Sequence, residues 1–140
     1  MQIYFSCSIT GGRSEEKTYQ KIVATLEEEG HHVPTAHLAT PQVMELEAVV
    51  DPVDIYRRDM QWLDEADAVV AEVSTPSHGV GYEIARALQQ GKPVFCCFQS
   101  QKRVSKIITG NTSPGLVLAP YSSDEEVIGL LRQFLAGLRF

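Results

Sequence analysis

Hydrophobic positions along the chain follow two spacings that alternate from the first residues onward. Continuous apolar runs predict buried strands at 2–8, 67–73, 93–98 and 115–119. Apolar residues three or four positions apart predict helices at 14–29, 53–66, 79–90, 103–109 and 122–138. The segment 31–38 predicts a weaker strand, which Pro34 restricts to a sheet edge. The pattern at 41–50 is compatible with either a helical turn or a loop.

Strands that alternate with helix-length connections predict parallel pairing through right-handed crossovers. Five strands in 140 residues fit a single α/β domain spanning 1–140. We expect one doubly wound, flavodoxin-like parallel sheet in the order 2-1-3-4-5, with helices on both faces. Ligands of such sheets bind beyond the carboxyl ends of the strands, where the strand order reverses. The expected site therefore lies between the loops 8–13 and 74–81.

Composition and charge narrow the classes of function. Twelve basic residues against eighteen acidic ones give a net charge of −6, which argues against a nucleic-acid polymer as partner. No apolar run approaches the roughly 18 residues that span a bilayer, and the first residues read as a strand rather than a leader. We therefore expect no membrane partner and a cytoplasmic location, or a nuclear one in a eukaryote. The thiols of Cys7, Cys96 and Cys97 are expected to be buried and reduced, and no metal site is expected.

The loop 8–13 follows the first strand and leads into a helix. Its glycines let backbone approach a ligand closely, Thr10 offers a hydroxyl and Arg13 offers a cationic fork. The loop lacks both the GxxxxGK[ST] phosphate loop and the GxGxxG dinucleotide pattern, so neither ATP nor NAD is expected as a cofactor. A tight strand-to-helix turn without any ligand explains the same residues equally well.

The second loop contains more groups suited to chemistry. Ser77 is placed to cap the helix 79–90, and Gly79 and Gly81 leave its first turn free of side chains, exposing N–H groups to an anion. Glu83 follows one turn later, where the helix dipole favours its ionised form. A carboxylate beside an anion site is a candidate nucleophile or cation stabiliser. The alternative is that Glu83 only complements the helix dipole.

Asp59 is a second candidate carboxyl group. Its apolar helix neighbours favour burial, which would raise its pKa. One ionised and one protonated carboxyl are what acid-assisted cleavage of a glycosidic bond requires. Tyr4, near the end of the first strand, is a candidate to place its hydroxyl at the same site. Asp59 as a solvated helix acid and Tyr4 as a core residue are the alternatives, and Trp62 is expected in the core.

Three segments carry a family resemblance: IYFSCSITGGR at 3–13, DMQWLDEADAVVAEV at 59–73 and PSHGVGYE at 76–83. Together, in this order and spacing, they resemble the 2′-deoxynucleoside 5′-phosphate N-hydrolases of the nucleoside 2-deoxyribosyltransferase family. The likeness runs from residue 3 to about residue 110. It implies a homodimer that hydrolyses the N-glycosidic bond of a deoxynucleoside monophosphate, releasing free base and 2-deoxyribose 5-phosphate, without a cofactor.

The resemblance also implies roles for individual residues. Glu83 matches the nucleophile that forms a covalent deoxyribosyl-enzyme, Asp59 the carboxyl that assists departure of the base, and Tyr4 a tyrosine beside the sugar. The implied substrate-binding residues are Ser6, Ser8, Ile9, Thr10, Gly11, Arg13, His37, Ser77, Gly79, Gly81 and Ser105.

Some of these binding positions are implied for particular parts of the nucleotide. His37 falls near the base, the segment 77–81 holds the 5′-phosphate, and Ser105 reaches that phosphate from the neighbouring subunit. Thr10 departs from the family, which has an arginine there that contacts the substrate. His78, if protonated, would restore part of that charge.

Three other functions remain open on the sequence. A deoxyribosyltransferase would keep the covalent intermediate and pass the sugar to a second base. A ribonucleoside monophosphate N-hydrolase would differ in the sugar that it accepts. A nucleotide-binding sensor would keep the pocket without turnover, although two facing carboxyl groups argue for an enzyme.

Overall fold

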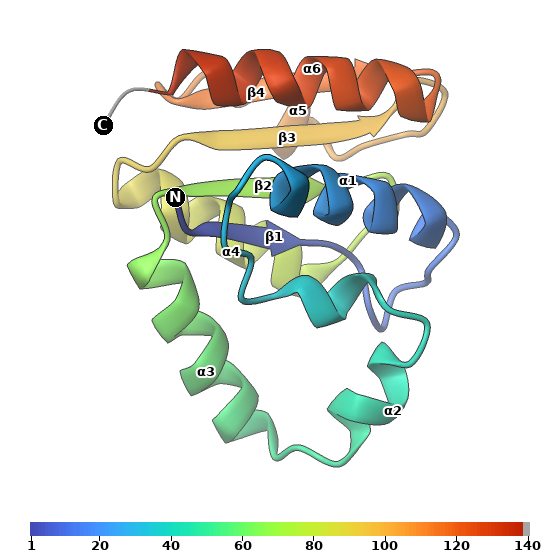
Figure 1. Cartoon of the computed structure of the whole chain (residues 1–140), viewed down its shortest axis with the longest axis vertical. Coiled ribbons are helices and arrows are strands. Elements are labelled where there is room, and N and C mark those ends of the chain that lie inside the picture. Colours follow the sequence, from blue (N-terminus) through green and yellow to red (C-terminus); the bar gives the residue numbers. More distant parts are fainter. Residues whose placement is uncertain (139–140) are drawn as a thin grey trace.

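A parallel sheet lies between two layers of helices in the computed structural model, which describes residues 1–138 (Figure 1). Its four strands run in the order β1 (Ile3–Ser6), β2 (Ala68–Glu72), β3 (Val94–Gln99) and β4 (Leu116–Tyr121). The helical elements are α1 (Glu16–Glu28), the 3₁₀ helix η1 (Ala36–Ala39), α2 (Val43–Ala48), α3 (Pro52–Glu65), α4 (His78–Gln89), α5 (Lys106–Thr109) and α6 (Asp124–Gly137). The α/β class and the parallel pairing expected from the sequence are confirmed.

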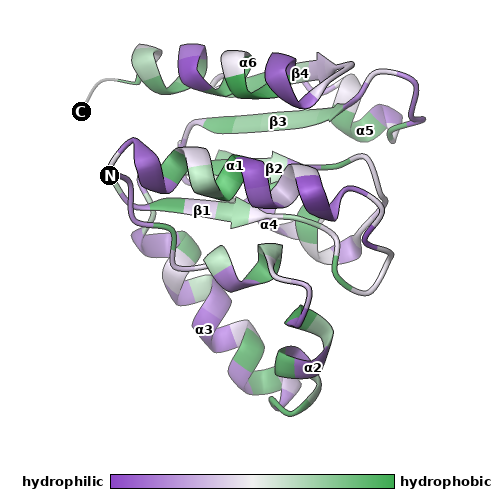
Figure 2. Ribbon diagram, turned by 45° about the vertical axis from the view of Figure 1, so that its right-hand side comes forward, coloured by the Kyte–Doolittle hydropathy of each residue, from purple (hydrophilic) through white to green (hydrophobic). Residues whose placement is uncertain are grey.

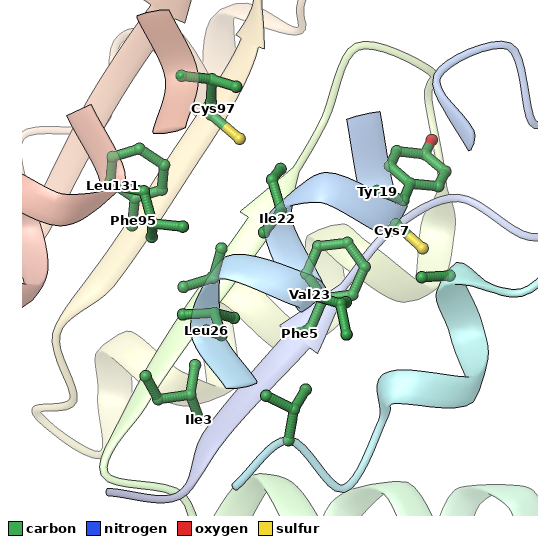
Figure 3. Packing of buried hydrophobic residues seen from close by; sticks show 14 of the residues in the cluster. Ile3, Phe5, Cys7, Tyr19, Ile22, Val23, Leu26, Phe95, Cys97 and Leu131 are labelled. Atoms are coloured by element: carbon green, nitrogen blue, oxygen red, sulfur yellow. The ribbon is translucent and has the colours of Figure 1, made fainter. Parts of the chain in front are cut away.

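Helices cover both faces of the sheet, as expected. In Figure 1, α1 crosses in front of the strands and α4 lies behind them. On the α1 and α6 face, Phe5 packs against α1 and Phe95 lies beside Leu131 of α6 (Figure 3). Successive strand residues point to opposite faces, so Cys97 belongs to this cluster and Cys96 to the cluster beneath α3 and α4. The three cysteines are buried and free, as predicted.

The prediction of a fifth strand at 31–38 is wrong. Only one bridge forms there, between Gln2 and His32, and the chain then turns into η1. Further along β1, the N–H of Phe5 donates to the Thr35 hydroxyl at 2.9 Å instead of to a backbone carbonyl. Pro34 lacks an N–H and restricts its own φ, so the backbone leaves the sheet edge after one pair. The sheet is therefore four-stranded, and the order 2-1-3-4-5 loses its first member.

The segment left undecided at 41–50 contains a short helix, α2. Together with the first half of α3, it projects away from the sheet (Figures 1 and 2). Asp51 caps α3 by accepting the Val53 N–H at 2.9 Å, and Pro52 occupies the first helical position. Because this projection has little core beneath it, several apolar side chains on it are exposed: Met44, Leu46, Val49, Val53 and Tyr56.

No helix within residues 1–138 is both long enough and apolar enough to cross a lipid bilayer.

Candidate active site

The two loops expected to form the site meet beyond the carboxyl ends of β1 and β2. The backbone of Gly11 lies against that of Pro76 so closely that a Cβ on Gly11 would stand 2.4 Å from the Pro76 carbonyl oxygen. The next residue, Gly12, has a φ of +128°, which side chains rarely tolerate. Both glycines are therefore required by the contact between the loops, which brings the first turn of α4 beside the end of β1.

The N-terminus of α4 is open to an anion. The Ser77 hydroxyl accepts the Val80 N–H at 3.4 Å, and the Ser77 carbonyl accepts the Gly81 N–H at 3.2 Å. Within residues 1–138, the N–H groups of His78 and Gly79 have no hydrogen-bond acceptor. Two unpaired donors at the positive end of a twelve-residue helix favour a bound anion.

A cavity of about 580 Å³ lies in front of this helix end, between the two loops and α5. Five residues predicted to bind substrate line it: Thr10, Gly11, Ser77, Gly81 and Ser105. The same wall includes two basic residues, His78 and Arg103. His78 was expected only to supply charge when protonated, and no sequence pattern pointed to Arg103. Ser105 and Ser77 of one protomer therefore border one cavity.

Glu83 lies in the second turn of α4, and its carboxyl group faces the end of β1. The Ser6 hydroxyl donates to Glu83 Oε1 at 3.2 Å. The Tyr4 hydroxyl is fully buried, lies close enough for the charge of Glu83 to raise its pKa, and has no partner of hydrogen-bonding geometry within residues 1–138. Buried polar groups without a partner are uncommon in folded proteins, which makes the Tyr4 hydroxyl a candidate contact for a ligand.

Burial strongly affects the charge of Glu83. Burial raises the pKa of this carboxyl group to about 7, and the charge of Asp59 adds to the effect. The dipole acts mainly within the first turn, and Glu83 is the sixth residue of α4. Burial therefore opposes the ionised form that the helix dipole was expected to favour.

Asp59 belongs to a cluster between α3, α2 and η1. Arg58 Nε donates to Asp59 Oδ1 at 2.9 Å, and the other end of the guanidinium donates to Glu47 Oε1 at 2.9 Å. His37 Nε2 lies 3.2 Å from the same Glu47 oxygen. Burial raises the pKa of Asp59 even though Arg58 opposes it. The solvated alternative for Asp59 therefore does not hold, and His37 and Asp59 lie in one cluster as the sequence suggested.

Trp62 packs against the core cluster beneath α3 and α4, as expected in part, but it is not fully buried. It is half-buried, with the Arg58 guanidinium 4.9 Å above its ring and the His37 ring 5.9 Å away, edge to face. Neither Arg58, Glu47 nor Trp62 was assigned to the site from sequence. These groups meet only because the projecting arm, formed by α2 and the first half of α3, folds back over η1. No local sequence pattern predicts that contact.

The carboxyl groups and the cavity adjoin through the first turn of α4. Glu83, Asp59 and Tyr4 do not line the cavity itself. Gly79 stands between them and the helix end, and a Cβ there would come within 3.8 Å of Glu83 Oε1. A methyl group at position 79 would therefore be in van der Waals contact with this carboxyl group.

Arg13 does not face the cavity. Its guanidinium donates to the carbonyls of Leu38 at 2.6 Å and Thr40 at 3.0 Å, and it pairs with Glu16 at 3.0 Å. These contacts fasten η1 to the start of α1, so the cationic fork predicted for a ligand serves the fold. Ile9 packs against the core, and the fully buried Ser8 hydroxyl has no hydrogen-bond partner within residues 1–138.

A buried acid holds the second loop at its base. Glu72, fully buried at the end of β2, accepts the Ser74 N–H at 2.6 Å, the Ser74 hydroxyl at 3.0 Å and the Tyr121 hydroxyl. The Ser74 hydroxyl also accepts the Gln99 N–H at 2.8 Å, which links the loop to β3. The only sequence signal for this network is an acid at the end of an otherwise apolar strand. The network fixes where the loop leaves the sheet toward Ser77.

Within residues 1–138, no three histidine, cysteine or acidic side chains come together as a metal site would require.

Residues 3–126 match the sequence profile described as nucleoside 2-deoxyribosyltransferase. A protein of the pike Esox lucius, named 5-hydroxymethyl-dUMP N-hydrolase, is 39% identical over 143 residues, covering 99% of this chain and 98% of the relative. A Methanococcoides burtonii protein, provisionally named 2′-deoxynucleoside 5′-phosphate N-hydrolase 1, is 41% identical over 112 residues, covering 80% and 92%.

Solved structures share the fold at low sequence identity. The CMP N-glycosidase of Clostridium botulinum superposes with a TM-score of 0.72 at 20% identity, over 96% of this chain and 99% of that one. A 2-deoxyribosyltransferase of Bacillus psychrosaccharolyticus superposes with a TM-score of 0.65 at 19% identity, over 91% and 90%.

Proposed function

The chain belongs to the nucleoside 2-deoxyribosyltransferase family, and we propose that it hydrolyses the N-glycosidic bond of 2′-deoxynucleoside 5′-monophosphates. The products are the free base and 2-deoxyribose 5-phosphate. Relatives at about 40% identity carry the names of N-hydrolases that act on such monophosphates. The observation that carries the proposal is the position of the Glu83 carboxyl, bonded to Ser6 and set one turn behind an open helix N-terminus.

The 5′-phosphate binds at the start of α4. The free N–H groups of His78 and Gly79, with the Ser77 and Ser105 hydroxyls beside them, supply donors to its oxygens. The sugar then passes over Gly79, where no side chain blocks it, and its anomeric carbon reaches Glu83. The base lies toward the cluster of Asp59 and His37.

The first chemical step transfers the sugar to the enzyme. Glu83 attacks C1′ as a carboxylate while the bond from C1′ to the base nitrogen breaks with its electron pair going to the base. Asp59, whose pKa burial raises, donates a proton to the departing base. The intermediate is an ester between Glu83 and C1′. The buried Tyr4 hydroxyl lies beside this carboxyl and is available to the sugar ring.

The second step returns the enzyme to its starting state. Asp59, now a carboxylate, takes a proton from a water molecule that attacks C1′, and the Glu83 carboxylate leaves. Only Asp59 changes its protonation state between the two steps, and burial, which raises its pKa, favours the protonated form that the first step needs. A sugar without a 2′-hydroxyl forms the cation-like transition state more readily, which favours deoxyribonucleotides.

A homodimer is part of the proposal. Exposed apolar side chains lie on the arm and on the rim of the cavity, including Val49 at 86%, Tyr56 at 52%, Tyr82 at 51% and Ile107 at 83% exposure. A second copy of the chain would cover them, whereas Ser105 of the same chain already lines the cavity beside Ser77, contrary to the expectation that it comes from the neighbouring subunit. Light scattering at micromolar concentration tests the dimer. A monomer that retains full activity contradicts it.

The reaction is tested by incubating the protein with each common deoxy- and ribonucleoside monophosphate, and with the matching nucleosides, and by separating free base by chromatography. Base release from deoxynucleoside monophosphates supports the proposal. Release only from ribonucleotides would indicate a ribonucleotide hydrolase, and transfer to an added base in preference to water would indicate a transferase. Binding without any base release would contradict an enzymatic role.

A further inference from the structure

Arg103 lines the cavity in front of α4, and no other described residue forms an ion pair or hydrogen bond with its side chain. It precedes α5 and lines the cavity together with Ser77 and Ser105. Its guanidinium makes no ion pair or hydrogen bond within the described chain, whereas the adjacent Lys102 lies 3.8 Å from Glu15. Arg103 is exposed and borders the cavity, so its guanidinium is accessible to a bound ligand.

The charge of the cavity favours an anion, although the whole chain carries −6. Its lining includes no aspartate or glutamate, and its titratable residues are His78, Tyr82 and Arg103. Arg103 is therefore the one permanent charge on the wall, which also includes the positive end of the α4 dipole at Ser77 and His78. Both sources of positive potential act on the same space.

We propose that Arg103 pairs with the 5′-phosphate and makes the enzyme select phosphorylated over unphosphorylated substrates. This inference rests on the proposed function and names a residue that none of the sequence patterns assigned. The N–H groups of α4 hold one side of the phosphate, and the guanidinium contacts the other in a two-pronged, charge-assisted contact. Arg13 does not substitute for it, because its fork is taken up by the carbonyls of Leu38 and Thr40.

The proposal places phosphate binding and bond cleavage at different ends of the substrate. Arg103 lies at the phosphate end, and the reacting carbon lies beyond Gly79 beside Glu83. Removing the guanidinium should therefore raise the KM for a monophosphate while leaving turnover of an unphosphorylated nucleoside unchanged. A loss of about 10- to 100-fold in kcat/KM for the monophosphate is expected from one charged contact.

The experiment compares Arg103→Ala and Arg103→Lys with a matched control, Lys106→Ala. Lys106 is an exposed cation three residues along that does not line the cavity. Each protein is assayed with the best deoxynucleoside monophosphate and with its nucleoside. The proposal expects the KM rise only for the monophosphate in Arg103→Ala, an intermediate value in Arg103→Lys, and no change in Lys106→Ala. Equal kinetics of Arg103→Ala and wild type on the monophosphate, or equal losses on both substrates, would overturn it.

A binding measurement separates this inference from the proposed function. Calorimetric titration of wild type and Arg103→Ala with 2-deoxyribose 5-phosphate needs no turnover. Weaker binding to the variant supports the role of Arg103 even where no base is released by wild type, an outcome that would defeat the proposed hydrolysis alone. Equal affinities of the two proteins would defeat the role of Arg103 alone.

Discussion

The Ser6 hydroxyl donates a hydrogen bond of 3.2 Å to Glu83 Oε1, joining the end of β1 to the second turn of α4. Residues 77 positions apart are thereby fixed in one geometry. The Ser6 bond engages Oε1, and in the proposed mechanism the same carboxyl group attacks the sugar. The bond also favours the ionised form of Glu83, against the burial that raises its pKa.

Ser6→Ala should therefore weaken the nucleophile in a way that pH reveals. Without this hydrogen bond the pKa of Glu83 rises further, so the acid limb of the kcat/KM profile should move to higher pH, with about a tenfold loss at neutral pH. Ser14→Ala, which alters an exposed serine, is the control. An unchanged acid limb in Ser6→Ala would show that the bond does not tune Glu83.

The wild-type pH profile is predicted from the same carboxyl. The proposed mechanism needs Glu83 as a carboxylate and Asp59 as an acid, so kcat/KM should rise with pH through the pKa of Glu83, about 7 in the free protein, and fall at higher pH once Asp59 loses its proton. Initial rates of base release between pH 5 and 9 measure this. A rate already at its maximum near pH 5 would contradict the raised pKa or the nucleophilic role.

Stability should respond to Glu83 in the opposite sense from activity. A carboxyl whose pKa is 4.5 when unfolded and about 7 when folded destabilises the fold as pH rises between these values, and fully above about pH 7. Glu83→Gln removes this cost, so it should be more stable than wild type above pH 7, by up to about 3 kcal/mol, with no gain near pH 4. Urea unfolding of wild type and Glu83→Gln at pH 4 and at pH 8 measures this difference in the free energy of unfolding. A variant less stable than wild type at pH 8 would contradict the prediction.

The loop contact at Gly11 predicts a steric failure. A methyl group there would overlap the Pro76 carbonyl at 2.4 Å, so Gly11→Ala should push the two loops apart and lower kcat/KM by at least about tenfold. Gly129→Ala is the control, because a Cβ at that position in α6 meets nothing within 4 Å. Kinetics and thermal unfolding of both variants provide the comparison. Unchanged activity in Gly11→Ala would mean that the loops do not need this approach.

The buried bond between Tyr121 and Glu72 predicts a loss of stability. Tyr121→Phe leaves the Glu72 carboxyl with one donor fewer in a fully buried place, which should cost about 1–3 kcal/mol. Tyr56→Phe, which removes the hydroxyl of an exposed tyrosine, should change little. Chemical denaturation of both variants at one pH tests the difference. Equal stability of the two variants would show that this network does not hold the loop.

The sequence predicted the parts of the molecule that depend on neighbouring residues. The apolar runs located all four strands, and Ser77 with its glycines located the start of α4. The absence of the predicted fifth strand was not predictable in this way. The Thr35 hydroxyl accepts the Phe5 N–H, which would have paired with a backbone carbonyl of a neighbouring strand. No periodicity signals that a hydroxyl will replace a backbone carbonyl.

The part of the candidate site that lies at the ends of the strands was also predictable. Glu83, Tyr4 and Ser6 come together because parallel strands end at one edge of the sheet, which topology alone implies. The roles of Arg13 and Arg103 were not predictable. Both are arginines in polar loops, and only the folded chain shows that one is bonded to carbonyls while the other borders the cavity.

The central claim is that Glu83 forms a bond to the sugar. Its most direct test is free-base release from the best deoxynucleoside monophosphate by wild type, Glu83→Ala and Glu65→Ala, an exposed acid of α3, with the acid-quenched wild-type reaction examined by mass spectrometry. The account predicts at least a thousandfold loss in Glu83→Ala, full activity in Glu65→Ala and a deoxyribose phosphate adduct on the peptide that contains Glu83. Near-normal base release by Glu83→Ala would contradict it.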